Sequence, residues 1–189
     1  MTIPMKVGII TASDRASRGE REDRSGLLLK ALMEELPAEV IAYQVLPDDR
    51  AILKKTLCHV ADRFSCDVIL TTGGTGLGPR DNTPEATREI IGKEIPGIAE
   101  ALRMGGLKKT KYAVLSRGIA GIRNRTLIIN LPGNPEAVRD AVEVLTPLLG
   151  HMVELLRGEV RDCQSRHSEG EARRILDPSP SIEAVEGSG

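Results

Sequence analysis

The fold of this 189-residue chain is decided by the stretch Asp67-Val68-Ile69-Leu70-Thr71-Thr72-Gly73-Gly74-Thr75-Gly76-Leu77-Gly78-Pro79-Arg80-Asp81. Its first six residues form a compact apolar run that is typical of a buried strand. Four glycines follow within six residues, and glycine allows positive φ angles and a close approach of backbone N–H groups to an anion. The stretch therefore predicts a buried strand that runs into a phosphate-binding loop.

The glycine loop matches neither of two familiar nucleotide-binding loops. No lysine follows the glycines, as a Walker A loop requires, and Pro79 stands where a dinucleotide fingerprint has its third glycine. The hydroxyls of Thr72 and Thr75 add donors for a ligand. A purely structural turn remains the alternative, although so many glycines cost up to about 1 kcal/mol each relative to alanine.

Outward from this loop, short apolar strands alternate with amphipathic helices. Strands are expected at 6–11, 40–45, 67–72, 113–115 and 126–130, and helices at 23–36, 49–64, 84–92 and 97–105. Two consecutive helices follow Asn134, with a break near Thr146-Pro147 and an end at Gly158. Thr83 is expected to cap the helix that starts at Pro84. The alternation predicts an α/β protein with three layers, α/β/α, around a mostly parallel sheet.

The composition divides the chain into one domain and a tail. We expect the domain at 1–160 and a flexible tail at 161–189, where Glu, Ser, Arg, Pro and Gly dominate and no aromatic residue occurs. The three cysteines, Cys58, Cys66 and Cys163, fit neither a disulfide framework nor a zinc site. Reduced thiols, no membrane-length apolar run and no signal peptide together predict a cytoplasmic protein without a membrane partner.

Charge and aromatic content argue against a nucleic-acid partner. The 26 basic and 27 acidic residues leave a net charge of −1, whereas a polyanion-binding module usually has a basic excess. One Phe, two Tyr and no Trp are too few for a platform on which bases stack.

Two aspartates are expected to lie close to the glycine loop. The loops 13–19, 47–49 and 73–81 each follow a strand, so they should meet at one edge of the sheet, where such sheets bind ligands. Asp48 and Asp81 would then face a phosphate, which they repel unless a cation lies between them. The pair favours Mg²⁺, which takes one or two carboxylates together with phosphate oxygens and water. Helix capping or a turn is the structural alternative for both carboxylates.

Further polar residues extend this candidate site. Arg80 offsets phosphate charge or is simply a surface residue, and Ser13-Asp14 after the first strand either caps a helix or contacts a ligand. Candidate ligand contacts beyond the glycine loop are Ser116, Asn130, Pro132, Gly133 and Asn134. The three histidines lie in helices or in the tail, away from the strand ends, which argues against hydrolase catalysis with a histidine base.

Four motifs in this order and spacing resemble a known family. They are Thr71-Thr72-Gly73-Gly74-Thr75-Gly76, Arg80-Asp81-x-Thr83-Pro84-Glu85-Ala86, Leu115-Ser116-Arg117 and Asn130-Leu131-Pro132-Gly133-Asn134-Pro135. Together they resemble the molybdopterin adenylyltransferases of the MogA/MoaB type, whose relatives include plant proteins and animal gephyrin. The resemblance runs from about Lys6 to Gly158.

The resemblance implies a homotrimeric enzyme that transfers AMP from ATP to the terminal phosphate of molybdopterin and releases pyrophosphate. It implies that Asp48 and Asp81 are the catalytic acids that hold Mg²⁺, and that the product passes to a molybdenum insertase of the MoeA kind. It places pterin and phosphate contacts among Thr75, Gly76, Ser116, Asn130 and Gly133, without saying which ligand each serves.

Two other functions stay open. The Arg-Asp-x-Thr-Pro motif is more similar to MogA proteins, whereas the direct run from Asn134 to Gly158, without an inserted segment, is similar to MoaB proteins. A MoaB-like scaffold that binds molybdopterin without turnover is therefore one alternative. A pyrophosphatase acting on ADP-ribose or nucleotide sugars, as in competence-damage proteins, is another.

Overall fold

The centre of the protein is a six-stranded sheet with the strand order β2-β1-β3-β6-β5-β4. The computed structural model describes residues 4–159, so the predicted tail at 161–189 and Cys163 lie outside the described residues. The strands are β1 (Met5–Ala12), β2 (Ala38–Leu46), β3 (Val68–Thr72), β4 (Lys93–Glu94), β5 (Ala120–Arg123) and β6 (Thr126–Leu131). The four strands β2, β1, β3 and β6 are parallel, and β5 and β4 form an antiparallel edge.

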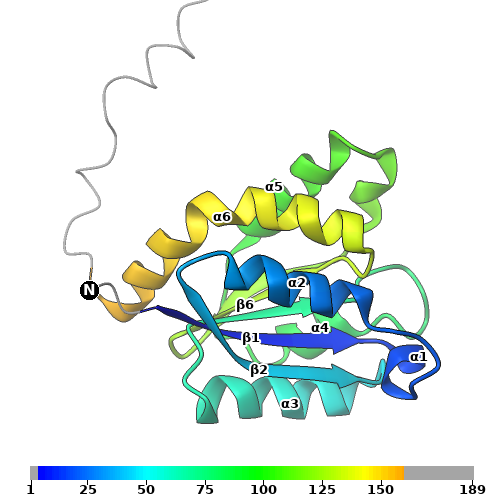
Figure 1. Cartoon of the computed structure of the whole chain (residues 1–189), viewed down its shortest axis with the longest axis horizontal. Helices are drawn as coiled ribbons and strands as arrows, with labels where there is room; N and C mark the ends of the chain where they lie inside the picture. Colours follow the sequence, from blue (N-terminus) through cyan, green and yellow to red (C-terminus); the bar gives the residue numbers. More distant parts are fainter. Residues whose placement is uncertain (1–3, 160–189) are drawn as a thin grey trace, which may run out of the picture.

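Helices cover both faces of the sheet, as Figure 1 shows. They are α1 (Asp14–Ser17), α2 (Arg24–Glu34), α3 (Arg50–Arg63), α4 (Thr83–Arg88), α5 (Pro96–Leu107) and α6 (Pro135–Arg157), together with a 3₁₀ helix, η1 (Lys111–Leu115). Helices α2, α5 and α6 pack on one face and α3 and α4 on the other. The predicted α/β/α architecture with a mostly parallel sheet is confirmed.

Strand β1 shows why the sheet has two apolar faces. Its successive side chains point to opposite faces: Val7 and Ile9 join the core under α2 and α6, and Ile10 and Ala12 join the core under α3. Gly8 lets α3 approach closely, since a Cβ there would lie 2.9 Å from Cγ1 of Val60. A strand buried on both sides places polar residues only at its end, where the loops begin.

The predicted strand at 113–115 is wrong. These residues belong to η1, whose start is capped by Thr110 through a hydrogen bond from the N–H of Tyr112 to its Oγ1. Val114 and Leu115 remain 54% and 46% exposed, so this apolar run does not enter the core. The strand beside β6 is β5 instead, which the sequence pattern missed because it is short and contains a glycine.

The predicted break near residue 146 is also wrong, because α6 runs unbroken through Pro147. Proline in a helix costs about 3 kcal/mol through a lost hydrogen bond and a steric clash. Here Pro147 lies on the exposed side, while a buried apolar stripe continues past it through Leu145, Leu149 and Val153. Burying each such side chain contributes about 1.5–3 kcal/mol, which holds both halves on one axis.

The predicted capping role of Thr83 is not what the structure shows. Asn82 occupies the N-cap position of α4 without a side-chain hydrogen bond, and Thr83 is already the first helical residue. Its hydroxyl is buried and has no hydrogen-bond partner. No helix in residues 4–159 combines the length and the apolar composition that crossing a membrane requires.

Candidate functional site

The carboxyl ends of the parallel strands surround a polar cavity of about 230 Å³. It lies where the loops after β1, β2, β3 and β6 meet, as expected for a parallel sheet. Its lining residues come from all four loops and from the start of α2; they are Thr11, Ala12, Ser13, Ala16, Arg21, Glu22, Asp23, Arg24, Ser25, Asp48, Gly73, Gly74, Asp81 and Gly133. We call this space the rim cavity.

The glycine loop forms one wall of the rim cavity and needs its glycines. Gly73 and Gly74 have φ angles of 92° and 63°, in the region that favours glycine. A Cβ on Gly73 would lie 2.3 Å from the carbonyl oxygen of Ala12. Within residues 4–159, none of the hydrogen bonds uses the N–H groups of Gly74, Thr75 or Gly76 as donors. These donors are therefore available to an anion.

Two predicted acids, Asp48 and Asp81, both lie on the wall of the rim cavity. Asp48 follows β2, and its Oδ2 accepts a hydrogen bond of 2.8 Å from the N–H of Asp14. Asp81 ends the glycine loop, and its Oδ2 accepts a bond of 2.7 Å from the N–H of Gly78. Asp48 and Asp81 are 33 residues apart in the sequence, and they line the same cavity because the loops after β2 and β3 meet there.

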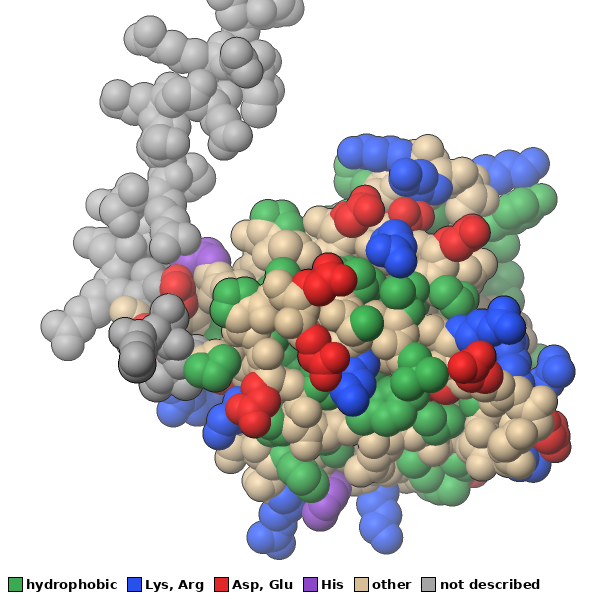
Figure 2. Space-filling model, in the orientation of Figure 1, with side chains coloured by type: hydrophobic (Ala, Val, Ile, Leu, Met, Phe, Trp, Pro, Cys, Tyr) green, Lys and Arg blue, Asp and Glu red, His purple; other side chains and the backbone are tan. Residues whose placement is uncertain are grey.

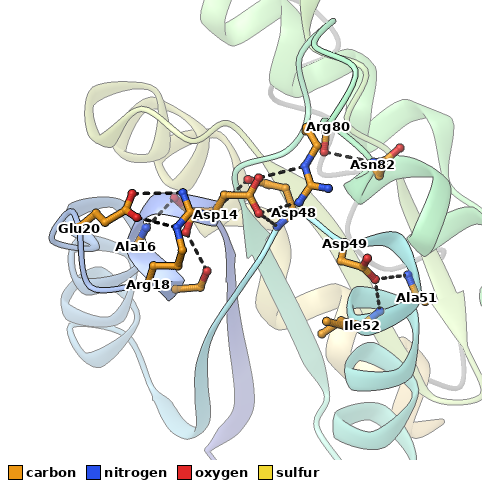
Figure 3. A network of polar contacts seen from close by, with 12 residues as sticks. Asp14, Ala16, Arg18, Glu20, Asp48, Asp49, Ala51, Ile52, Arg80 and Asn82 are labelled. Carbon is orange, nitrogen blue, oxygen red and sulfur yellow. Dashed lines mark hydrogen bonds and ion pairs between the residues drawn. The ribbon is translucent and has the colours of Figure 1, made fainter.

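Asp14, in the segment after β1, links that segment to the loop after β2 and to the glycine loop after β3 (Figure 3). The N–H of Asp48 donates back to Oδ1 of Asp14 over 3.1 Å, so the two aspartates exchange hydrogen bonds. Arg80, from the glycine loop, donates to both carboxylate oxygens of Asp14, at 3.0 and 2.7 Å. Arg80 is therefore paired with Asp14 in this structure rather than free to meet a phosphate.

The two neighbouring carboxyls have pKa values displaced in opposite directions. Hydrogen bonds from Arg80 lower the pKa of Asp14 below its ordinary value. Burial raises the pKa of Asp48, and the charges of Asp14 and Asp81 raise it further, against the opposing effects of the Asp14 N–H and of Arg80. Four of the side chains that line the rim cavity are acidic and two are arginines, and this excess of negative charge favours binding of a further cation.

Asp23, which the sequence indicated only as a helix start, also lines the rim cavity. It accepts hydrogen bonds of 2.6 Å from the hydroxyls of both Thr11 and Tyr43, and one of 2.9 Å from the N–H of Gly26. Burial raises the pKa of the Tyr43 hydroxyl, and the hydrogen bond that this hydroxyl donates to Asp23 raises it further. Asp23 thus fixes the start of α2 against β1 and β2, which supply Thr11 and Tyr43.

Arg117 belongs to the motif Leu115-Ser116-Arg117, and only the structure shows which groups it binds. Its guanidinium donates to the carbonyl oxygens of Gly76 and Asp81, at 2.7 and 2.5 Å, and forms an ion pair with Glu85. The backbone N–H of Arg117 donates to the carbonyl oxygen of Thr75. Arg117 therefore stabilises the glycine loop by binding carbonyl oxygens of the loop.

A second, more apolar cavity of about 200 Å³ lies between α5, η1, β6 and α6. Its wall includes Tyr112, Arg103 and three of the predicted contacts, namely Ser116, Asn130 and Pro132. The Asn130 side chain already donates to the hydroxyls of Thr71 and Thr87 and accepts from the N–H of Ile119, so its bonds hold the fold.

The remaining predicted contacts also have structural bonds. Ser13 caps α1 and lines the rim cavity, whereas Asn134 caps α6. The buried hydroxyl of Thr72 donates to the carbonyl oxygen of Pro132 over 2.6 Å, which joins the glycine loop to the turn at Gly133. The structure thus gathers Ser13, Asp48, Gly73, Gly74, Asp81 and Gly133 at the rim cavity and places Ser116, Asn130 and Pro132 at the second cavity.

This fold and this rim define a class: α/β proteins whose candidate binding site lies at the carboxyl ends of a mostly parallel sheet. Comparison with known proteins narrows the class. A family described as "Probable molybdopterin binding domain" matches residues 8–151. The chain belongs to this family.

Named relatives and solved structures agree with that membership. A Helicobacter pylori molybdopterin adenylyltransferase is 43% identical over 164 residues, which cover 85% of this chain and 93% of the relative. The crystal structure of the Thermus thermophilus molybdopterin biosynthesis enzyme MoaB is 51% identical, has a TM-score of 0.77 and covers 82% of this chain and 97% of its own. A MogA structure is 40% identical, with a TM-score of 0.76 and coverage of 80% and 99%.

Proposed function

We propose that this protein is a molybdopterin adenylyltransferase, which transfers AMP from ATP to the terminal phosphate of molybdopterin and releases pyrophosphate. The observation that carries the proposal is the rim cavity, where two carboxylates, Asp48 and Asp81, face a glycine loop with free N–H donors. The curated relatives that are named molybdopterin adenylyltransferases support the same reaction.

The rim cavity suits Mg²⁺. Its excess of negative charge, which contributes to the raised pKa of Asp48, calls for a cation. Residues 4–159 contain no group of three or more His, Cys, Asp or Glu side chains placed to hold a metal by themselves. Mg²⁺ fits such a pair of acids, since it binds through one or two carboxylates and takes phosphate oxygens and water as its other ligands. Held by Asp48 and Asp81, it would stabilise negative charge on the transferring phosphoryl group and on pyrophosphate.

The chain's own residues bind and orient the reactants. The N–H groups of Gly74, Thr75 and Gly76 donate to phosphate oxygens. The Thr75 and Gly76 N–H groups are oriented by the hydrogen bonds that hold the carbonyl oxygens of their own peptides, from the backbone N–H of Thr83 to Gly74 and from that of Arg117 to Thr75. The attacking phosphate monoester of molybdopterin is already ionised near pH 7, so no side chain has to remove a proton. Catalysis then consists of positioning and charge stabilisation.

The second cavity takes one of the two flat heterocycles, pterin or adenine. Its wall is mostly apolar, with the ring of Tyr112, the guanidinium of Arg103 and Asp140 as polar or stacking groups. Such a cavity, apolar with a few placed polar groups, is typical of a small-molecule site. It adjoins the rim cavity through the turn at Pro132 and Gly133, each of which lines one of the two.

The assembly and the cellular setting are part of the same proposal. A homotrimer would cover the exposed apolar side chains of α5 and η1, which are Met104, Leu107, Tyr112, Val114 and Leu115. The face in Figure 2 has acidic and basic side chains interspersed, in keeping with the net charge of −1. We expect a cytoplasmic trimer that passes adenylylated molybdopterin to a MoeA-type insertase, and sedimentation of the purified chain would test its trimeric state.

The decisive experiment supplies radiolabelled ATP, molybdopterin and Mg²⁺ and follows labelled adenylyl-molybdopterin. The wild-type chain should form it, and Asp81→Asn should abolish the transfer while leaving molybdopterin binding. Binding without transfer by the wild-type chain would instead identify a scaffold of the MoaB kind. Release of AMP from ADP-ribose would identify a pyrophosphatase, and turnover that persists in both Asp48→Asn and Asp81→Asn would refute the metal assignment.

A further inference from the structure

One buried polar atom in the site has no partner: the hydroxyl oxygen of Thr83. Thr83 is fully buried at the start of α4, and its hydroxyl does not cap that helix. Buried hydroxyls almost always have a hydrogen-bond partner, because an unpaired one retains the full cost of its desolvation. A lone unpaired hydroxyl beside a binding cavity therefore requires an explanation.

The surroundings of Gly74 show where this hydroxyl points. A Cβ built on Gly74 would lie 2.3 Å from Oγ1 of Thr83 and 3.3 Å from Oδ1 of Asp48. The hydroxyl oxygen of Thr83 and Oδ1 of Asp48 therefore both lie within 3.3 Å of the position that a side chain on residue 74 would take, and glycine has no side-chain atom there. The N–H of Thr83 already donates to the carbonyl oxygen of Gly74 over 3.1 Å, which fixes the position of Thr83 against the loop.

The two oxygens of Asp48 are in different situations. Oδ2 accepts the hydrogen bond from the N–H of Asp14. Oδ1, on the side of Gly74 and Thr83, accepts none of the hydrogen bonds found among residues 4–159. A carboxylate oxygen has two lone pairs, so Oδ1 can bind a cation and accept one hydrogen bond together.

We propose that Thr83 is a positioning residue, whose hydroxyl donates a hydrogen bond to Oδ1 of Asp48 when a divalent cation and a triphosphate fill the rim cavity. The inference rests on the proposed function. Hydrogen bonds of this kind are often long in an empty site and shorten in the loaded one. By holding Asp48 in one orientation, Thr83 preorganises the carboxylate for the cation, as partners of metal ligands commonly do.

The test compares two threonines of the same helix. Thr83→Val removes the unpaired hydroxyl and keeps the side-chain shape, and Thr83→Ser keeps the hydroxyl. The matched control is Thr87→Val: Thr87 is equally buried in α4, but its hydroxyl accepts a hydrogen bond of 2.9 Å from Asn130. The probe is Mn²⁺ with α,β-methylene ATP, in which transfer is blocked, and binding is followed by electron paramagnetic resonance alongside the melting temperature.

We expect opposite outcomes for the two valine variants. Thr83→Val should keep or raise the melting temperature but bind Mn²⁺ about 10- to 100-fold more weakly, and Thr83→Ser should bind it nearly as the wild type does. Thr87→Val should melt at a lower temperature yet bind Mn²⁺ normally. Wild-type affinity in Thr83→Val, or a melting temperature below that of Thr87→Val, would overturn the inference.

A further pair of variants separates this inference from the proposed function. If Asp48→Asn and Asp81→Asn weaken Mn²⁺ binding and Thr83→Val does not, the metal assignment stands and the role of Thr83 is refuted. If neither aspartate affects Mn²⁺ binding, the metal assignment fails and the inference fails with it.

Discussion

The ion pair between Arg117 and Glu85 offers a direct test of how the glycine loop is held. Arg117→Met removes the guanidinium and keeps most of the apolar stem, and Glu85→Gln removes only the charge of its partner. The two side chains are 36% and 29% exposed, so we place their coupling near 1 kcal/mol, between an exposed ion pair and a buried charged hydrogen bond. Arg117→Met also loses the bonds to the carbonyl oxygens of Gly76 and Asp81 and should cost about 2–3 kcal/mol in total.

Urea denaturation of the wild type, both single variants and the double variant measures these terms as a double-mutant cycle. Calorimetric titration with α,β-methylene ATP and Mg²⁺ measures the ligand affinity of the same four chains. Arg117→Met should weaken ligand binding at least tenfold, because the loop it releases must be ordered again on binding. If Arg117→Met and Glu85→Gln cost the same and both keep wild-type affinity, the two carbonyl contacts do not hold the loop and the reasoning is refuted.

Three further predictions concern the rest of the fold. Gly74→Ala should destabilise the chain by at least about 1–2 kcal/mol in thermal denaturation, because its φ is 63° and a Cβ there would lie 2.3 Å from Oγ1 of Thr83. The helical control Gly150→Ala, which has open space around it, should stabilise the chain by up to about 1 kcal/mol. Burial opposes ionisation of Asp67, but hydrogen bonds from Arg157 and a backbone N–H outweigh it and lower its pKa. The stability that Asp67 contributes is therefore present above about pH 4 and is lost as the pH falls through the lowered pKa. The difference in the free energy of unfolding between wild type and Asp67→Asn, measured in urea titrations, should therefore shrink in acid. An unchanged difference at about pH 3 would contradict this. Pro147→Ala should raise the free energy of unfolding by about 1–2 kcal/mol, since α6 is already continuous there, and a loss of stability would show that the proline is needed.

Much of the candidate site was predictable because it depends on strand ends. Asp48 and Asp81 lie in the loops after β2 and β3, and parallel strands bring such loops to one edge of the sheet. The roles of individual side chains were less predictable. Asn130 lines the second cavity, as a ligand contact should, but its side chain also bonds to Thr71, Thr87 and Ile119, which come from β3, α4 and the segment before β5 and meet only in the folded chain.

Arg117 shows why such roles escape the sequence. It lies 36 residues from Asp81 and 32 from Glu85, and no periodic pattern connects the three. Its partners come together only after β3 and the loop before β5 have docked. For Thr83 the sequence did indicate a role, that of a helix cap, but the structure places its hydroxyl beside Gly74 instead.

The amino-acid sequence by itself determined the alternation of strands and helices, the glycine loop and the helix starts near Asp23, Asp49 and Asn134, since these depend on interactions within about four residues. Tertiary structure alone decided the antiparallel edge of β5 and β4 and the unbroken course of α6 through Pro147. The physical reason is that a weak local preference is outweighed when many distant side chains are buried together. Local signals set where each element lies along the chain, and the shared core sets its final shape.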